Sequence, residues 1–194
     1  MNTNTEFQAA DRLNGLALSE IVQISERAAE LRRQGVDVIA LSTGEPDFPT
    51  PAHVVEAAYQ AALAGQTRYT ETAGTPDLRA AVAGLAGVGV EQVMISTGAK
   101  QVLANAFLAT LNPGDEVIMA APFWTSYADM VRLAGGVAVV LTCDAAQAFK
   151  LTPAQLEQAI TPRTRWLLLN SPSNPSGAIY SEAELRALAA VLSR

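Results

Sequence analysis

The sequence contains one cysteine, one histidine and two lysines among its 194 residues, and each scarcity excludes a class of protein. The lone Cys143 cannot form an internal disulfide, and the single His53 excludes a metal site built from several histidines. No run of about 18 apolar residues occurs, so we expect no transmembrane span. The polar start, Met1 to Asp11, lacks an apolar signal region. We therefore expect a soluble cytoplasmic protein.

Charged residues are also scarce, at 16% of the chain, whereas 49% of the residues are hydrophobic. This composition is sufficient for one buried core and excludes a disordered tail. The net charge of −6 argues against nucleic acids and anionic membrane surfaces as partners. We therefore expect a folded domain that binds neither nucleic acid nor membrane.

Short apolar runs alternate with amphipathic stretches in the second half of the chain. The runs that predict strands are Val93–Ser96, Glu116–Ala120, Val137–Leu141 and Trp166–Leu169. Helices are expected over Gln101–Thr110 and Phe123–Ala134, and two more begin at capping boxes that start with Thr152 and Ser181. This alternation predicts an α/β fold with a mainly parallel sheet covered by helices on both faces.

The first third of the chain precedes this alternation. An N-terminal arm leads into a helix with apolar residues at helical spacing from Ile21 to Leu31, and a short strand is expected over Val36–Leu41. The loop Ser42–Pro51 carries three prolines and one glycine, so it is neither helix nor central strand. Pro51 is expected as the first residue of the next helix.

Three loops at the carboxyl ends of predicted strands could hold a ligand, because parallel sheets bind ligands at that edge. In the first, Ser96–Lys100, the small residues Gly98 and Ala99 would let a phosphate approach the N–H groups of a helix start. An ordinary tight turn explains the same five residues about as well. A P-loop is excluded, because the glycine spacing is wrong.

The other two loops offer an aromatic ring and an amide. Trp124 could stack on a flat cofactor ring, although core packing is the usual role of a lone tryptophan. Asn174, in a loop stiffened by Pro172 and Pro175, could hold a phenolic oxygen or a carboxylate through its side-chain N–H. A turn with an Asx contact is the alternative, and the Asn-Pro-Ser-Gly spacing favours it less than usual. The backbone N–H of Gly44 could face a substrate carboxylate, or Gly44 could simply be a turn glycine.

Lys100 could act as a nucleophile or as a charge contact. The first turn of a helix favours the neutral amine, but the lysine would compete there with the phosphate for space. A charge contact to an anionic ligand is the better interpretation. His53 is expected to be solvated, and no Ser-His-Asp or Cys-His constellation is found in the sequence.

Six motifs in this order resemble the pyridoxal-phosphate aminotransferases of fold type I, in particular their bacterial aspartate-aminotransferase branch. The resemblance covers the chain from about Leu18 onward. Its motifs are Ser42–Phe48, Arg68-Tyr69 with Ala73-Gly74, Ser96–Gln101, Pro113–Val117, Pro122–Tyr127 and Asn170–Gly177.

The resemblance implies roles for particular residues. Gly98, Ala99 and Lys100 would line the cup for the cofactor phosphate, Trp124 would stack on the pyridine ring, and Asn174 would hold the phenolate oxygen and touch the substrate. Gly44 would contact the substrate carboxylate, and Trp124 and Lys100 would also face the substrate. Tyr69 would reach the phosphate of a neighbouring subunit, which implies a homodimer. The cofactor would be pyridoxal 5′-phosphate.

The resemblance also implies a specificity. Lys100 matches a lysine that faces the distal carboxylate of aspartate, but its usual hydroxyl partner falls on Ile21, which cannot donate a hydrogen bond. The expected activity is transfer of an amino group from an amino acid, with aspartate as a candidate, to a 2-oxo acid in amino acid biosynthesis.

The family continues beyond these motifs with an aspartate, a tyrosine, a Schiff-base lysine and an arginine that have no counterpart here. We therefore expect the N-terminal half of such an enzyme, inactive alone and without a catalytic residue. Residues 1–50 would belong to the small domain and residues 51–194 to the large cofactor-binding domain. A non-catalytic ligand-binding or dimerisation module of the same fold and a related fold-type-I lyase are the alternatives. A dinucleotide-binding domain is weaker, since no G-x-G-x-x-G follows a strand.

Overall fold

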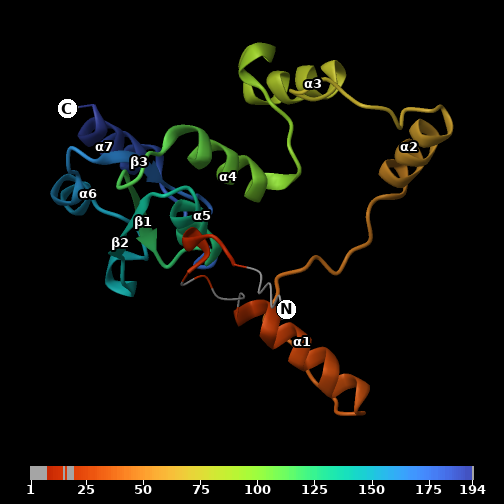
Figure 1. The fold of residues 1–194 in the computed structure, drawn as a ribbon, viewed down its shortest axis with the longest axis horizontal. Helices are drawn as coiled ribbons and strands as arrows, with labels where there is room; N and C mark the ends of the chain where they lie inside the picture. The colour runs from red at the N-terminus through yellow and green to blue at the C-terminus, as the bar shows by residue number, and fades with distance from the viewer. Residues whose placement is uncertain (1–7, 15, 17–19, 194) are drawn as a thin grey trace, which may run out of the picture. The chain divides into compact units, whose positions relative to one another are not determined.

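A computed structural model describes residues 8–14, 16 and 20–193 (Figure 1). These residues form two compact units. The helical unit comprises residues 20–101, and the sheet unit comprises residues 102–193 with the described residues before 20. One helix, α4 (Gly98–Thr110), begins in the first and ends in the second.

The helical unit is built from α1 (Glu20–Arg33), α2 (Ala52–Leu63), α3 (Pro76–Ala86) and the 3-10 turn η2 (Val90–Gln92). Pro76 occupies the first turn of α3, and Gly87 ends that helix in the left-handed conformation at φ 68°. The sequence predicts Pro51 as the first residue of α2, but it is the residue before the helix, which begins at Ala52.

The two strands predicted in this region, over Val36–Leu41 and Val93–Ser96, are wrong. No strand is present among the described residues of the helical unit. An apolar run becomes a strand only when a neighbouring backbone pairs with it. The carbonyl of Val93 instead accepts a hydrogen bond from Arg79 Nε at 2.9 Å.

The sheet unit contains a three-stranded parallel sheet in the order β2–β1–β3, which confirms the predicted α/β class. The strands are β1 (Glu116–Ala121), β2 (Val137–Thr142) and β3 (Thr164–Leu168), so the strand predicted over Trp166–Leu169 lies slightly too far toward the carboxyl end relative to β3. The other elements are η1 (Asp11–Leu13), α5 (Ser126–Leu133), η3 (Ala145–Gln147), α6 (Pro153–Ala159) and α7 (Glu182–Leu192).

The pairing of β3 with β1 is interrupted once, near its amino end. Glu116 pairs with Thr164, but the next residue, Val117, pairs with Trp166. Arg165 is therefore an extra residue on β3, and this bulge sets the register of the rest of that strand.

Helices cover both faces of the sheet because successive residues of β1 point to opposite sides. Val117 and Met119 pack against α4 and α5, whereas Ile118 packs against α6 and α7, and all three are fully buried. The first face is completed by Phe107, Leu111, Tyr127, Met130 and Val131. The second is completed by Cys143, Leu151, Leu156, Tyr180, Leu188 and Val191.

Helix starts in this unit follow the predicted signals in two of three cases. Thr152 and Ser181 accept hydrogen bonds from Gln155 N–H and Glu184 N–H, which confirms both capping boxes. The helix predicted over residues 123–134 begins instead at Ser126, after a turn closed by Tyr127 N–H donating to the Trp124 carbonyl at 3.0 Å. No helix in the described part of the chain is long and apolar enough to cross a membrane.

Candidate functional site

The carboxyl edge of the sheet carries a small cavity between the ends of β1 and β3. Its volume is about 20 Å³, roughly the room that one water molecule needs. None of its lining residues is charged: Ala120, Phe123, Tyr127, Phe149, Leu168, Leu169, Asn170, Ser173 and Tyr180. The cavity is thus uncharged, with apolar side chains and a few hydrogen-bonding groups in its lining.

Trp124 lies on the loop that follows β1, beside this cavity. It is half-buried, and its ring meets that of Tyr127 edge to face, with centroids 5.4 Å apart at 86°. Phe123 stacks on the same tyrosine at 6.3 Å and 29°. Since Phe123 and Tyr127 both line the cavity, these contacts orient an indole at its border.

The loop after β3, residues 170–177, is closed by hydrogen bonds of its own. Asn174 N–H donates to Asn170 Oδ1 at 2.8 Å, and Ser173 N–H donates to the Ala178 carbonyl at 2.9 Å. Gly177 N–H donates to the Ser173 carbonyl at 2.8 Å, with Gly177 itself at φ 71°. The loop is therefore braced internally, and Asn174 is exposed at its outer side.

The loop is also tied to the core below it. Ser171 Oγ accepts a hydrogen bond from Tyr180 N–H at 3.0 Å, and the Tyr180 hydroxyl accepts one from Leu151 N–H at 2.6 Å. Burial raises the pKa of Tyr180, and it also raises the pKa of the Cys143 thiol in the same core. Tyr180 is thus a neutral, buried anchor for the loop, and Cys143 is an unreactive core residue.

Lys150 and Glu184 form an ion pair on the same side of the sheet unit, at 2.5 Å. The hydrogen bond from Lys150, followed by the bonds from Ser181, lowers the pKa of Glu184 to about 2. Lys150 is therefore engaged as the partner of a carboxylate.

The predicted phosphate cup lies at the start of α4 in the helical unit. Gly98 adopts φ 81°, a conformation that favours glycine, and its N–H donates to the Ser96 carbonyl at 2.9 Å. The Gln101 side-chain oxygen accepts from Thr97 N–H at 3.3 Å. The next N–H groups of the first turn have no carbonyl partner within the helix, which is the general property that lets helix starts bind anions.

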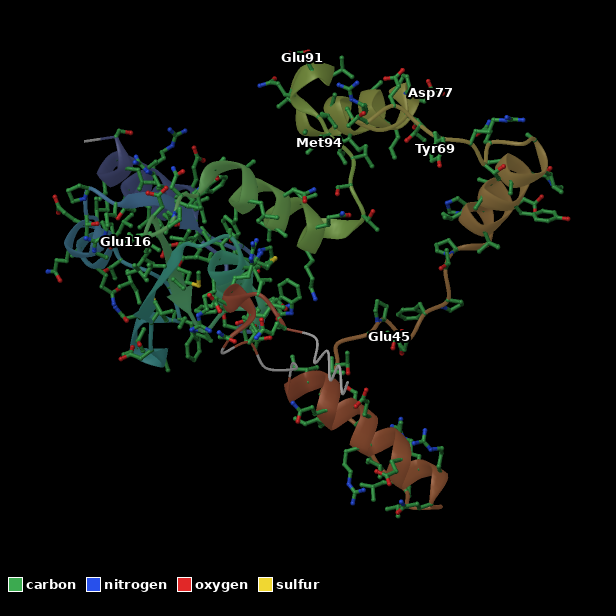
Figure 2. All side chains as sticks on the ribbon, in the orientation of Figure 1. Glu45, Tyr69, Asp77, Glu91, Met94 and Glu116 are labelled. Atoms are coloured by element: carbon green, nitrogen blue, oxygen red, sulfur yellow. The ribbon has the colours of Figure 1, made fainter. Side chains whose placement is uncertain are left out.

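The remaining predicted residues also belong to the helical unit. Gly44 follows Thr43, whose hydroxyl lies 3.1 Å from Ser25 Oγ on α1. The Tyr69 side chain is fully exposed (Figure 2), and Lys100 is exposed as well. The structure therefore brings Gly98, Ala99 and Lys100 together at one helix start, and Trp124 and Asn174 to one edge of the sheet.

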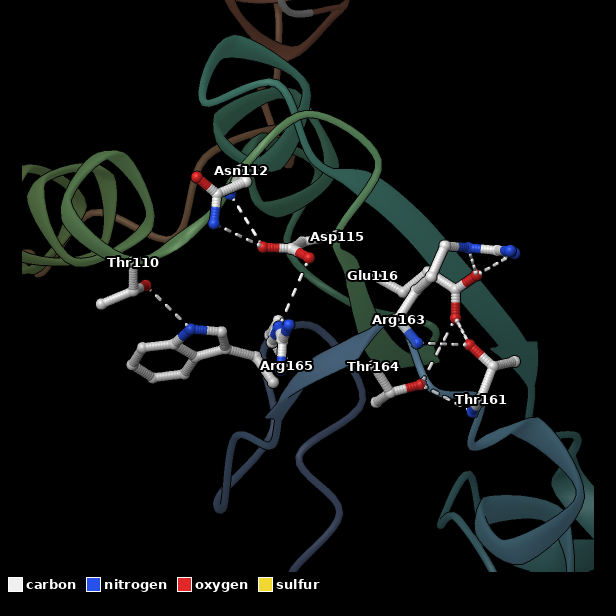
Figure 3. A network of polar contacts seen from close by, with 9 residues as sticks. Thr110, Asn112, Asp115, Glu116, Thr161, Arg163, Thr164 and Arg165 are labelled. Carbon is white, nitrogen blue, oxygen red and sulfur yellow. Dashed lines mark hydrogen bonds and ion pairs between the residues drawn. The ribbon is translucent and has the colours of Figure 1, made fainter.

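A different polar cluster occupies the opposite, amino edge of the sheet (Figure 3). Glu116, whose side chain is 6% exposed, accepts hydrogen bonds from Arg163 Nη2 at 2.6 Å and from Thr161 Oγ1 at 2.6 Å. The hydrogen bond from the Thr161 hydroxyl contributes most to lowering the pKa of Glu116. Burial opposes this shift, and the Arg163 guanidinium adds to it. Every polar atom of this carboxylate is engaged, so it is a structural group.

Asp115 extends this cluster on the same strand end. Its Oδ2 accepts from Asn112 N–H at 2.8 Å, and its Oδ1 lies 3.3 Å from Arg165 Nε. The hydrogen bond from Asn112 N–H contributes most to lowering the pKa of Asp115. Burial opposes this shift, and Arg165 adds to it. No group of three or more metal-ligating side chains is found in the described residues.

Sequence reasoning missed the residue that braces the candidate loop. Asn170 lines the cavity and accepts the hydrogen bond from Asn174, yet the sequence directed attention to Asn174 alone. The available signal was an asparagine in a segment rich in proline and serine, Asn170-Ser171-Pro172, since a carboxamide so close to a turn often bonds the backbone.

Comparisons with known proteins agree on one family. A family model for aminotransferases of class I and II matches residues 36–194. The aspartate aminotransferase of Rhizobium meliloti (strain 1021) is 51% identical over 195 residues, which cover 97% of this chain and 47% of that protein. The aspartate/prephenate aminotransferase of Thermus thermophilus is 48% identical, covering 92% of this chain and 48% of that protein.

Solved structures give the same result. The crystal structure of the Rhizobium meliloti aspartate aminotransferase matches with a TM-score of 0.91 at 50% identity, over 96% of this chain and 48% of that one. The Thermus thermophilus aspartate aminotransferase with maleate matches with a TM-score of 0.93 at 44% identity, over 97% of this chain and 51% of that one. The chain spans about half the length of the curated relatives it matches.

Proposed function

The chain belongs to the class I and II aminotransferases, and from that premise we propose that it supplies most of the seat for pyridoxal phosphate and part of the substrate site of an amino acid aminotransferase. The single observation that carries the proposal is the internally braced loop at residues 170–177, placed at the carboxyl edge of a parallel sheet with Trp124 on the neighbouring loop. This edge is where parallel sheets bind ligands.

The chemistry of the predicted residues fits the cofactor group by group. Pyridoxal phosphate has a phosphate, a flat ring and a phenolic oxygen. The α4 start, with Gly98, Ala99 and Lys100, offers N–H groups and a cation to the phosphate. Trp124 offers a ring face, and Asn174 offers a side-chain N–H to the phenolic oxygen. When bound, the cofactor supplies an electron sink for chemistry at the amino acid Cα.

The chain's own residues would bind and orient the two ligands. In this proposal Gly44 N–H holds the substrate carboxylate, Lys100 faces an anionic group, and Trp124 and Asn174 border both cofactor and substrate. Tyr69 is the residue that would reach the phosphate of a partner subunit, so the working protein would be a homodimer. Its fully exposed side chain leaves the hydroxyl accessible for that contact. The domain division at residue 50 remains part of the same proposal.

Aspartate is the first amino acid to test as the substrate, with a 2-oxo acid as the amino-group acceptor. Two relatives are named for aspartate, one as an aspartate aminotransferase and one as an aspartate/prephenate aminotransferase. Ile21, half-buried on α1, presents a side chain without a hydrogen-bond donor. Ile21→Thr should therefore raise the preference for a dicarboxylic substrate over an apolar one.

The proposal is tested first on binding. We expect the 194-residue chain to quench its tryptophan emission saturably when titrated with pyridoxal phosphate, and Asn174→Ala to weaken the affinity by roughly ten-fold or more. Asn112→Ala, at the amino edge of the sheet, serves as the matched control and should bind normally. A chain that folds but binds no pyridoxal phosphate would refute the proposed site.

A second measurement tests the expected absence of a covalent link. Borohydride reduction of the loaded chain, followed by peptide mass spectrometry, should leave Lys100 and Lys150 unmodified. A reduced adduct on either lysine would contradict the charge-contact role of Lys100 or the ion-pair role of Lys150. Amino-group transfer from aspartate should be measured on the product of the reading frame that encodes this chain.

A further inference from the structure

Asn170 links the end of β3 to the loop that carries Asn174. It lies two residues beyond Leu168, the last residue of β3, and it is half-buried at the wall of the carboxyl-edge cavity. Its Oδ1 accepts the hydrogen bond from Asn174 N–H at 2.8 Å. One side chain thus contacts both the cavity and the backbone of the residue expected to bind the cofactor.

No other group in the loop holds the Asn174 backbone in this way. Pro172 and Pro175 have no N–H to donate. The N–H groups of Ser173 and Gly177 are directed to the carbonyls of Ala178 and Ser173. The Asn174 N–H is satisfied by the carboxamide of Asn170 alone among the hydrogen bonds of the described loop.

From this geometry we infer that Asn170 is a positioning residue for the cofactor site. It fixes the backbone of Asn174, and so the direction from which the Asn174 carboxamide meets the phenolic oxygen of pyridoxal phosphate. The inference rests on the proposed function. The inference differs from the proposed function because Asn170 acts through Asn174 and not directly on the ligand.

A double-mutant cycle separates this role from general loop stability. The variants are Asn170→Ala, Asn174→Ala and the pair, each titrated with pyridoxal phosphate as the 194-residue chain. We expect Asn170→Ala to weaken the affinity about five-fold, the range that loss of one hydrogen bond allows. In the Asn174→Ala background the same change should alter the affinity by less than about two-fold, because no carboxamide remains to be positioned.

Amide hydrogen exchange gives a readout that does not depend on the ligand. Asn170→Ala should speed exchange of the Asn174 N–H, whereas Asn170→Asp keeps an acceptor oxygen at the same place and should preserve its protection. Should Asn170→Ala fail to fold, the exchange of Asn174 in Asn170→Asp decides, and loss of protection there overturns the inference. Asn112→Ala is the control for removing an asparagine from a turn.

The outcomes are distinguishable from those of the proposed function. If Asn174→Ala binds pyridoxal phosphate normally, the proposed site falls and the inference falls with it. If Asn174→Ala weakens binding and Asn170→Ala does not, the inference alone is wrong. It is also wrong if Asn170→Ala weakens binding equally in both backgrounds, because Asn170 would then act independently of Asn174.

Discussion

The two edges of the sheet contrast in how their polar groups are used. At the amino edge, the carboxylates of Asp115 and Glu116 are buried and engaged by Arg163, Arg165 and Thr161 (Figure 3). At the carboxyl edge, the cavity is lined by uncharged residues, and the Asn170 carboxamide and the Ser171 hydroxyl brace the adjoining loop. The same three strands therefore separate a closed, ionic end from an open, neutral one.

The difference teaches which end is available for recognition. A carboxylate whose oxygens are all occupied has little capacity left for a ligand. Exposed Asn174 and half-buried Trp124 instead present groups whose chemistry suits a flat, oxygen-bearing cofactor. Stability should thus depend more on the amino edge and on the core between the edges, and ligand affinity on the carboxyl edge.

The largest effect should come from the core that joins the two edges. Phe107 is fully buried and packs edge to face on Trp166, with centroids 5.7 Å apart. Phe107→Ala should lower the free energy of unfolding by about 3–5 kcal/mol, measured by urea titration. A loss below about 1 kcal/mol would show that this core contributes little to the stability of the chain.

A smaller effect, confined to one edge, should follow Glu116→Gln. The glutamine cannot form the ion pair with Arg163, so thermal unfolding should begin at a lower temperature while the affinity of the folded chain for pyridoxal phosphate stays unchanged. Glu182→Gln is the matched control, since its pair with Arg186 is 78% exposed on both sides and should matter little. Equal losses of stability and affinity in Glu116→Gln would break the contrast between the edges.

Acid should also weaken the sheet unit outside the uncharged cavity, through the ion pair of Glu184 with Lys150. The pKa of Glu184 in the folded chain is about 2, below its ordinary value of 4.5, so folding favours the ionised form. This stabilisation is complete above the ordinary value and is lost as the pH falls from about 4.5 toward 2. Urea midpoints measured from pH 7 to pH 2.5 should therefore decline less steeply in Glu184→Gln. An unchanged acid slope would exclude Glu184 as a contributor.

The smallest effect should come from Ser171→Ala at the carboxyl edge. The substitution removes the acceptor for the buried Tyr180 N–H, at a cost of about 1 kcal/mol. Amide exchange of Tyr180 should become faster, and the affinity for pyridoxal phosphate should change less than in Asn170→Ala. A larger loss of affinity in Ser171→Ala than in Asn170→Ala would mean that Ser171, and not Asn170, is the positioning residue.

Local signals predicted the sheet unit well. The apolar runs at Glu116–Ala120 and Val137–Leu141 lie within one residue of β1 and β2, and both predicted capping boxes formed. These features depend on alternation and on side chains three residues apart. The fold class followed from them.

Features that depend on distant partners were predicted poorly. The run at Val36–Leu41 has strand-like composition, but composition does not state whether a neighbour pairs with it. The contact of Glu116 with Arg163 spans 47 residues and leaves no local pattern. Asn170 was missed for a related reason, because its partner N–H is identified only by the path of the loop.

The cofactor and substrate roles of Gly44, Tyr69, Gly98, Ala99 and Lys100 stay predictions, as do those of Trp124 and Asn174. The motifs that suggested them lie in order along the chain, and the family match covers all but the first 35 residues. Binding measurements on the variants above are the direct way to assign each role.

The bulge at Arg165 has a consequence at the far end of its strand. Because side chains alternate along a strand, the extra residue sets which faces of the sheet Trp166, Leu167 and Leu168 occupy. A single-residue deletion at Arg165 should therefore remove the bulge and keep Val117 paired with Trp166, whereas a deletion within Trp166–Leu168 would exchange the two faces of the strand. The bulge is thus the place in β3 where a change of length by one residue disturbs the core least.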